Sequence, residues 1–212
     1  MLESTVTRFV AKGGRVRAVE LGDGRRIATD VVLLSIGIEP DIRLAQAADL
    51  PIQNGVLTDT SLRTPDSWIF AVGDCACFPN ASTGGLTRLE SVQNAADHGE
   101  CVAHELVGRG GGYQAVPWFW SDQRDLKLQI AGLSTGHDRV VIRGDPAERT
   151  FSVFWFKSGF LLGGESVNRP ADHMVIRRLL GTAREGSGGL TPEQVADTAF
   201  DLKLLARGAP EG

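Results

Sequence analysis

A short apolar run that ends in Gly73-Asp74 constrains this chain more than any other feature. Residues 68–72 read Trp-Ile-Phe-Ala-Val, the β-branched and aromatic content that is typical of a buried strand. Gly73 would let a ligand approach the backbone, and Asp74 would stand at the carboxyl end of a strand, where open α/β sheets bind ligands. The run therefore predicts a carboxylate that accepts hydrogen bonds from sugar or polyol hydroxyls. A tight turn after a strand is the alternative, which the dipeptide alone favours.

Length, composition and charge exclude several classes of protein. The 212 residues suffice for one large domain or two small ones, and a hydrophobic content of 42% can bury a sizeable core. The net charge of -4 gives no basic surface for nucleic acid. Three irregularly spaced cysteines fit a reducing compartment better than a disulfide framework, and neither a membrane span nor a signal peptide is recognisable. We therefore expect a cytoplasmic protein without nucleic-acid or membrane partners.

Hydrophobic periodicity predicts an α/β portion followed by a small α+β portion. In the first half we expect strands at residues 5–11, 15–21, 25–29, 31–36 and 68–72, and helices at residues 43–48 and 91–107. In the second half we expect strands at residues 126–133, 139–143, 150–156 and 160–167, and helices at residues 170–180 and 191–206. Residues 79–87 are expected to form a loop, residues 121–123 a turn and residues 184–189 a linker, while Asn168 and Thr191 are predicted helix caps.

Five segments follow one another along the chain, at residues 55–59, 62–65, 73–74, 88–95 and 117–123. In this order they resemble the C-terminal half of the flavin-dependent NAD(P)H:ferredoxin reductases, and the resemblance extends from about residue 31 to about residue 168. These enzymes pass electrons from NAD(P)H through FAD to small iron–sulfur proteins. The resemblance implies that residues 1–114 are a partial nucleotide-binding (FAD/NAD-linked reductase) domain. Residues 115–212 would then be the reductase C-terminal domain, which serves docking or dimerisation.

The resemblance also implies which residues face FAD. Gly73 and Asp74 would bind the ribityl chain, and the segment Glu90-Ser91-Val92 would aim a helix N-terminus at the isoalloxazine ring. The first turn of a helix carries unpaired N–H groups and the positive end of the dipole, which would favour the anionic reduced ring. An ordinary helix cap by Ser91 is compatible with this role.

Two tryptophans two residues apart form the remaining candidate site. Trp118 and Trp120 would share a face of an extended segment, so they can pair, and indole stacks well on flat rings. By resemblance, Trp120 would lie beside the isoalloxazine and the nicotinamide. Packing between two domains is an equally good explanation from composition alone.

No metal ligand and no catalytic residue is predicted. The spacing Cys75-Ala76-Cys77 suits neither a zinc site nor a dithiol, and the four histidines show no ligand spacing. Arg177, Arg178 and Arg184 could meet an acidic ferredoxin, although a solvated helix face explains them as well.

The dinucleotide fingerprint Gly-x-Gly-x-x-Gly is missing from the sequence. The two closest matches, at Gly22 and Gly108, have Ile27 and Tyr113 in place of the third glycine. We therefore expect a truncated product, a separately encoded C-terminal part or a fragment of such a reductase. It would use FAD and NAD(P)H, pass electrons to a [2Fe-2S] ferredoxin or a rubredoxin-like acceptor of an oxygenase system, and could form a homo-oligomer. The alternative is a non-catalytic assembly or binding module, and the sequence leaves open whether the isolated chain is an enzyme.

Overall fold

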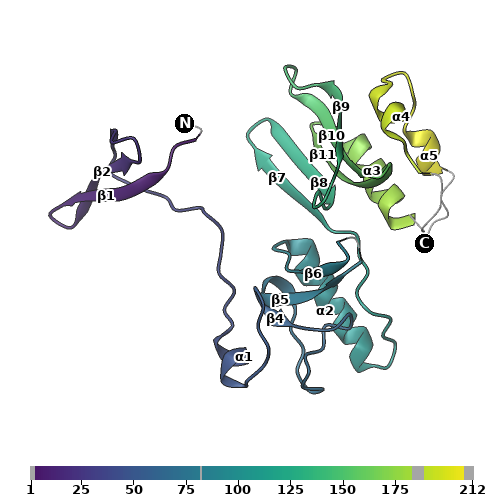
Figure 1. Cartoon of the computed structure of the whole chain (residues 1–212), viewed down its shortest axis with the longest axis horizontal. Coiled ribbons are helices and arrows are strands. Elements are labelled where there is room, and N and C mark those ends of the chain that lie inside the picture. Colours follow the sequence, from purple (N-terminus) through teal and green to yellow (C-terminus); the bar gives the residue numbers. More distant parts are fainter. Residues whose placement is uncertain (1–2, 82, 183–188, 208–212) are drawn as a thin grey trace. The chain divides into compact units, whose positions relative to one another are not determined.

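The computed structural model describes residues 3–81, 83–182 and 189–207 (Figure 1). The chain divides into two compact units, residues 1–39 and 40–212. The boundary falls at Glu39-Pro40, within residues 29–42, which form neither helix nor strand.

The first unit is the predicted β-meander. Strands β1 (Val6–Lys12), β2 (Arg15–Leu21) and β3 (Arg26–Ala28) form a three-stranded antiparallel sheet in the order β1-β2-β3. The turn between β1 and β2 contains Gly13 and Gly14, which both have positive φ angles of 61° and 73°. These three predicted strands are confirmed.

The predicted strand at residues 31–36 is wrong. This segment has no regular secondary structure, and Leu33 and Ile36 are 88% and 89% exposed. A strand with an all-apolar pattern needs neighbouring strands and a layer on each face. Within the described residues, none of the three sheets includes this segment, so the pattern is present without the structure that it normally forms.

The second unit begins with a small mixed sheet and a long helix. Helix α1 (Arg43–Ala47) forms as predicted, and strand β5 (Ala76–Asn80) pairs in parallel with β4 (Val56–Leu57) and antiparallel with β6 (Gly85–Thr87). The prediction of a loop at residues 79–87 is therefore partly wrong, because β5 and β6 form a hairpin there. Helix α2 (Val92–Leu106) is confirmed.

Residues 68–72 do not form the predicted strand. Trp68 lies in a turn and is 90% exposed, and the segment makes only an isolated bridge between Phe70 and Arg63. The backbone is held by single hydrogen bonds, such as that from Ala71 N–H to the Leu62 carbonyl at 3.1 Å. An apolar run without a neighbouring strand remains an irregular extended segment, although Gly73-Asp74 still follows it in a tight turn.

A five-stranded antiparallel sheet with the order β7-β8-β11-β10-β9 dominates the rest of the chain. Its strands are β7 (Trp118–Gln123), β8 (Leu126–Gly132), β9 (Arg139–Asp145), β10 (Thr150–Lys157) and β11 (Phe160–Val167). Helix α3 (Pro170–Thr182) contacts β8 and β11, and two short helices follow, α4 (Pro192–Ala196) and α5 (Lys203–Arg207). The four strands predicted after residue 125 are confirmed. The turn predicted at residues 121–123 is wrong, because these residues continue β7.

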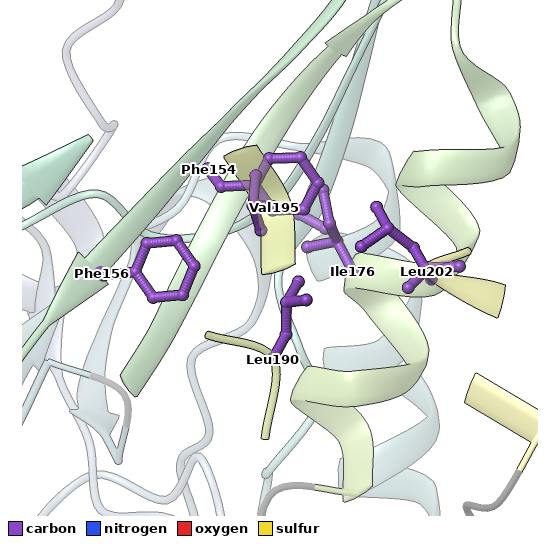
Figure 2. Packing of buried hydrophobic residues seen from close by; sticks show 8 residues of the cluster. Phe154, Phe156, Ile176, Leu190, Val195 and Leu202 are labelled. Carbon is purple, nitrogen blue, oxygen red and sulfur yellow. The ribbon is translucent and has the colours of Figure 1, made fainter. Parts of the chain in front are cut away.

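The core of this sheet lies between β10 and the C-terminal helices. Figure 2 shows Phe154 and Phe156 from β10 close to Ile176, Leu190, Val195 and Leu202. A glycine of β11 allows the helix to approach, since a Cβ on Gly164 would come within 2.8 Å of Ile176 Cδ1. Burying such side chains contributes about 1.5–3 kcal/mol each, which makes this core the main source of stability in the described part.

The helix predicted at residues 191–206 is interrupted, and Arg143 explains why. The side chain of Arg143 is buried and donates hydrogen bonds to four backbone carbonyls, those of Val195, Asp197, Thr198 and Phe200, at 2.6–3.2 Å. Carbonyls that turn toward a guanidinium are not available to continue a helical ladder. The predicted capping box at Thr191 is nevertheless confirmed.

The predicted cap at Asn168 is wrong. Its amide accepts a hydrogen bond from Lys127 N–H at 2.9 Å and donates one to the Arg149 carbonyl at 3.0 Å. Asn168 therefore ties the end of β11 to two neighbouring segments instead of capping α3. The predicted linker at residues 184–189 lies outside the described residues, except for Gly189.

Candidate functional site

The Gly73-Asp74 pair forms the first part of the candidate site. Gly73 is buried with a φ of 69° and begins a short 3-10 turn, Gly73–Cys75, that leads into β5. A Cβ at Gly73 would lie 3.3 Å from the Cβ of Ala95 on α2, so the turn is packed against that helix. Asp74 is exposed, and among the described residues nothing forms a hydrogen bond or an ion pair with its carboxylate. This carboxylate is therefore available to accept hydrogen bonds from a ligand.

Arg88 connects this turn to the segment before α2. Its Nη1 donates to the Asp74 carbonyl at 2.9 Å, and its Nη2 forms an ion pair with Glu90 Oε1 at 2.7 Å. The Arg88 side chain is only 10% exposed. It passes close to Gly55, whose φ of 138° and close approach to Cys75 exclude a larger residue. The sequence alone assigned Arg88 no role, although it adjoins the predicted segment.

The start of α2 is capped as predicted. Ser91 Oγ accepts a hydrogen bond from Asn94 N–H at 3.1 Å, and Val92 at the first helical position is 70% exposed. The positive end of the helix dipole therefore points out of the protein near Glu90, Ser91 and Val92.

A buried polar network joins α2 to the aromatic strand. Gln93 Oε1 accepts from the backbone N–H of Trp118 at 3.2 Å, and the hydroxyl of Tyr113 donates to Asn94 Oδ1 at 3.2 Å. The Gln93 amide nitrogen donates to the Asp97 carboxylate. Burial, together with the charge of Asp97, raises the pKa of Tyr113 to about 12, so the phenol stays protonated. These bonds fix the position of β7 relative to the start of α2.

The two tryptophans pair as expected. The rings of Trp118 and Trp120 stack with centroids 5.4 Å apart and an interplanar angle of 29°. The guanidinium of Arg177 also lies over the Trp118 ring, 4.4 Å from the ring centroid. Trp120 remains 41% exposed, which leaves part of the indole available for contact with a ligand.

A small cavity lies between the segment before α2 and strand β7, and Gly73, Asp74 and Trp120 are not among its lining residues. It has a volume of about 120 Å³ and is lined by Glu90 and Ser91 before α2 and by Trp118 and Phe119 of β7, with residues of β8 behind them. Because Arg88 contacts both Asp74 and Glu90, the turn at Gly73-Asp74 lies near the segment Glu90-Ser91-Val92, and these are five of the six predicted residues. Trp120 joins them through its stack on Trp118.

The arrangement has three chemical properties. It offers an acceptor for hydroxyl groups at Asp74, a positive helix end that favours negative charge, and a stacked aromatic pair beside a cavity. Within the described ranges, no group of histidine, cysteine and acidic side chains is arranged to hold a metal ion. Cys75, Cys77 and Cys101 are free thiols, and burial raises the pKa of Cys77 and Cys101.

No helix in the described part of the chain combines the length and the apolar character that a bilayer crossing requires.

Two protein families match consecutive parts of the chain. The family described as pyridine nucleotide-disulphide oxidoreductase matches residues 1–99, and the family described as reductase C-terminal matches residues 118–206. The second match begins at Trp118, the first residue of β7.

Similar proteins are reductases of small electron carriers. Rhodocoxin reductase of Rhodococcus erythropolis is 48% identical over 203 residues, which are 96% of this chain and 47% of the relative. A ferredoxin reductase structure from Rhodopseudomonas palustris superimposes with a TM-score of 0.90 at 48% identity, covering 96% of this chain and 49% of that one. The covalent complex of putidaredoxin reductase with putidaredoxin gives a TM-score of 0.89 at 34% identity, covering 97% and 49%. The chain thus spans about half the length of the relatives that it matches.

Proposed function

Because this chain belongs to the ferredoxin reductases of the pyridine nucleotide-disulphide oxidoreductase family and corresponds to their C-terminal portion, we propose that it forms the ring-side wall of a FAD site. The complete protein would then be an NAD(P)H:ferredoxin oxidoreductase that delivers electrons to a [2Fe-2S] ferredoxin or a rubredoxin-like protein of an oxygenase system. The observation that carries the proposal is the free carboxylate of Asp74, whose backbone Arg88 ties to Glu90 at the start of α2.

The residues fit one end of FAD and not the other. An exposed carboxylate suits the ribityl hydroxyls, and the helix end with the neighbouring cavity suits the isoalloxazine. The diphosphate needs a glycine-rich turn at a helix N-terminus, and these 212 residues contain no Gly-x-Gly-x-x-Gly. We therefore assign the chain the polyol and ring contacts only.

Each site residue would have a defined task. Asp74 would hold the polyol through charge-assisted hydrogen bonds, and Gly73 would let it approach the backbone. The start of α2, at Ser91 and Val92, would stabilise negative charge on the reduced ring, while the ion pair of Glu90 with Arg88 keeps this segment in place. Trp120 would exclude water beside the ring. When bound, FAD supplies the exchange between a two-electron donor and one-electron acceptors.

The two parts of the chain would serve different purposes. We assign residues 1–114 to the nucleotide-binding portion and residues 115–212 to an interface or dimerisation domain. Exposed Val140 and Ile142 on the edge strand β9 support an interface there, and sedimentation of the purified chain tests it. Arg177, stacked on Trp118, supports contact with an acidic electron carrier. The three free thiols support a cytoplasmic location.

Titration of FAD into the purified chain, followed by flavin fluorescence, tests the site. We expect weak, saturable quenching, because the diphosphate has no partner. Asp74→Ala should weaken binding by about tenfold or more, the contribution of a hydrogen bond to a charged group. Asp125→Ala, which removes an exposed carboxylate paired with Arg149, is the matched control and should leave the titration unchanged. Equal curves for Asp74→Ala and the unaltered chain would remove Asp74 from the site.

A non-catalytic assembly module is the second candidate function. The missing phosphate-binding fingerprint favours it. In that case the chain would neither quench flavin fluorescence nor support NADH-dependent reduction of a dye in the presence of FAD, yet it would bind a reductase chain. The same titration therefore separates the two functions.

A further inference from the structure

A buried histidine lies directly beneath the Gly73-Asp74 turn. His98, on the inner side of α2, is 0% exposed and packs edge-on against the rings of Phe78 and Tyr113, with centroids 4.7 Å and 4.3 Å away. Its Nδ1 accepts a hydrogen bond from the backbone N–H of Gly73 at 3.0 Å, across 25 residues of sequence. The sequence alone gave this histidine no role, because its partner is a backbone group that no motif reveals.

The hydrogen bond determines the form of the imidazole. An Nδ1 that accepts must carry no proton, so the ring is neutral with its proton on Nε2. Nε2 has no hydrogen-bond partner among the described residues. Burial lowers the pKa of His98 to about 4, although the nearby carboxylate of Asp97 acts in the opposite direction. The histidine therefore remains an acceptor throughout the neutral range.

The bond acts on a buried glycine whose backbone is in the left-handed region. Gly73 is buried, and its left-handed φ of 69° is one that other residues rarely adopt. On the other side of Asp74, the guanidinium of Arg88 holds the Asp74 carbonyl at 2.9 Å. His98 and Arg88 thus restrain the backbone just before and just after the exposed carboxylate.

We propose that His98 is a positioning residue, which holds the Gly73-Asp74 turn in the conformation that presents the Asp74 carboxylate to a polyol. This inference rests on the proposed function for the identity of the ligand. His98 is enclosed by protein and acts only through Gly73, so it makes no contact with a ligand. Losing its acceptor leaves a buried N–H unsatisfied, and the turn then rearranges to hydrate that group.

Two variants separate the hydrogen bond from the packing of the ring. In His98→Asn, the side-chain oxygen takes the place of Nδ1 and can still accept from Gly73 N–H. In His98→Leu, an apolar group stands there, while the side chain still fills much of the space beside Phe78. We expect amide hydrogen exchange at Gly73 to be about tenfold faster or more in His98→Leu, and close to the unaltered rate in His98→Asn. Equal protection of Gly73 in all three proteins would overturn the inference.

The flavin titration provides a second measurement. In the unaltered chain and in His98→Asn, Asp74→Ala should weaken FAD binding to a similar extent. In His98→Leu the same change should have little effect, because Asp74 is no longer held in place. An undiminished effect of Asp74→Ala in His98→Leu contradicts a positioning role.

The two proposals can fail separately. If the unaltered chain does not bind FAD, the proposed function fails, and hydrogen exchange at Gly73 still decides the role of His98. If His98→Leu does not fold, nuclear magnetic resonance of the unaltered chain tests the hydrogen bond between Gly73 and His98 directly. We expect a scalar coupling between the Gly73 amide nitrogen and His98 Nδ1, with ¹⁵N shifts of the Nε2–H tautomer. An Nδ1–H tautomer, or no coupling, would sink the inference.

Discussion

Two apolar regions of this chain differ in solvent exposure. The core between β10 and α3 buries its apolar side chains, so that Phe154, Phe156 and Ile176 are 0% exposed. Residues 31–36 leave theirs in solvent, with Leu33 88% and Ile36 89% exposed. The two differ in their surroundings and not in hydrophobicity. Strand β10 has a strand on each side and helices over one face, whereas residues 31–36 pair with no strand in the described part of the chain. An apolar pattern therefore specifies burial only where its partners are present.

The largest expected effect comes from removing a buried aromatic side chain from the core. Phe154→Ala should lower the free energy of unfolding by about 3–5 kcal/mol, because it removes a fully buried ring and leaves a cavity. Phe160→Ala is the matched control, since Phe160 lies at the β10–β11 turn and is 62% exposed, and it should cost less than about 0.5 kcal/mol. Urea unfolding followed by circular dichroism measures both. Similar losses for the two variants would show that the core is not where the structure places it.

Acid should weaken the buried regions through two histidines. Burial lowers the pKa of His98 and of His173 to about 4 from an ordinary 6.5, and Arg177 adds to the effect at His173. The unfolded chain therefore binds protons that the folded chain does not, so stability is complete above about pH 6.5 and falls as the pH drops toward 4. Each histidine contributes roughly 3 kcal/mol over this window.

Urea unfolding at a series of pH values measures this loss. If stability stayed constant between about pH 6.5 and pH 5, the two histidines would be protonated alike in the folded and unfolded states, contrary to their burial.

The four hydrogen bonds from Arg143 hold the segment between α4 and α5 against β9, and replacing Arg143 tests how much they contribute to stability. Arg143→Leu should cost about 2–3 kcal/mol, because four carbonyls lose a charged donor and those that stay buried remain unsatisfied. Arg139→Leu, which removes an ion pair with Glu193 at 53% and 70% side-chain exposure, should cost between about 0 and 1 kcal/mol. Unfolding of both variants by urea is the measurement. If Arg143→Leu lowered the free energy of unfolding no more than Arg139→Leu, the carbonyls released by Arg143 would be hydrated without loss of stability.

The smallest effect should come from the exposed region. Leu33→Gln and Ile36→Gln should change the stability of the chain by less than about 0.5 kcal/mol, since neither side chain leaves water on folding. The same urea experiment applies. A loss above about 1 kcal/mol for either variant would show that residues 31–36 are buried in solution and would abolish the contrast between the regions.

Features set by neighbouring residues were predictable from the sequence. The meander, the hairpin at Ser158-Gly159 and the capping box at Thr191 all depend on turn and cap chemistry within a few positions, and all three form. The Ser91 cap formed for the same reason.

Features that depend on distant residues were not predictable. The break between α4 and α5 comes from Arg143, which lies 52 to 57 positions away from the carbonyls that it binds. Asn168 was expected to cap a helix, but Lys127 at a distance of 41 residues uses its oxygen. In the candidate site, Asp74 and the segment Glu90-Ser91-Val92 could be proposed from the sequence, whereas Arg88 and His98 act on the backbone of the turn and carry no sequence signature of their own.

The stacked indoles give this molecule an optical property. The rings of Trp118 and Trp120 lie 5.4 Å apart with planes inclined by 29°, so we expect their electronic transitions to couple and, where the transitions are skewed, to give a paired band of opposite signs in circular dichroism. Since that band depends on the mutual orientation of two neighbouring rings, it reports on the geometry of one strand, and the far-ultraviolet signal reports on the chain as a whole. A change in this band without a change in the far-ultraviolet signal would therefore report a movement within β7 while the rest of the chain stays folded.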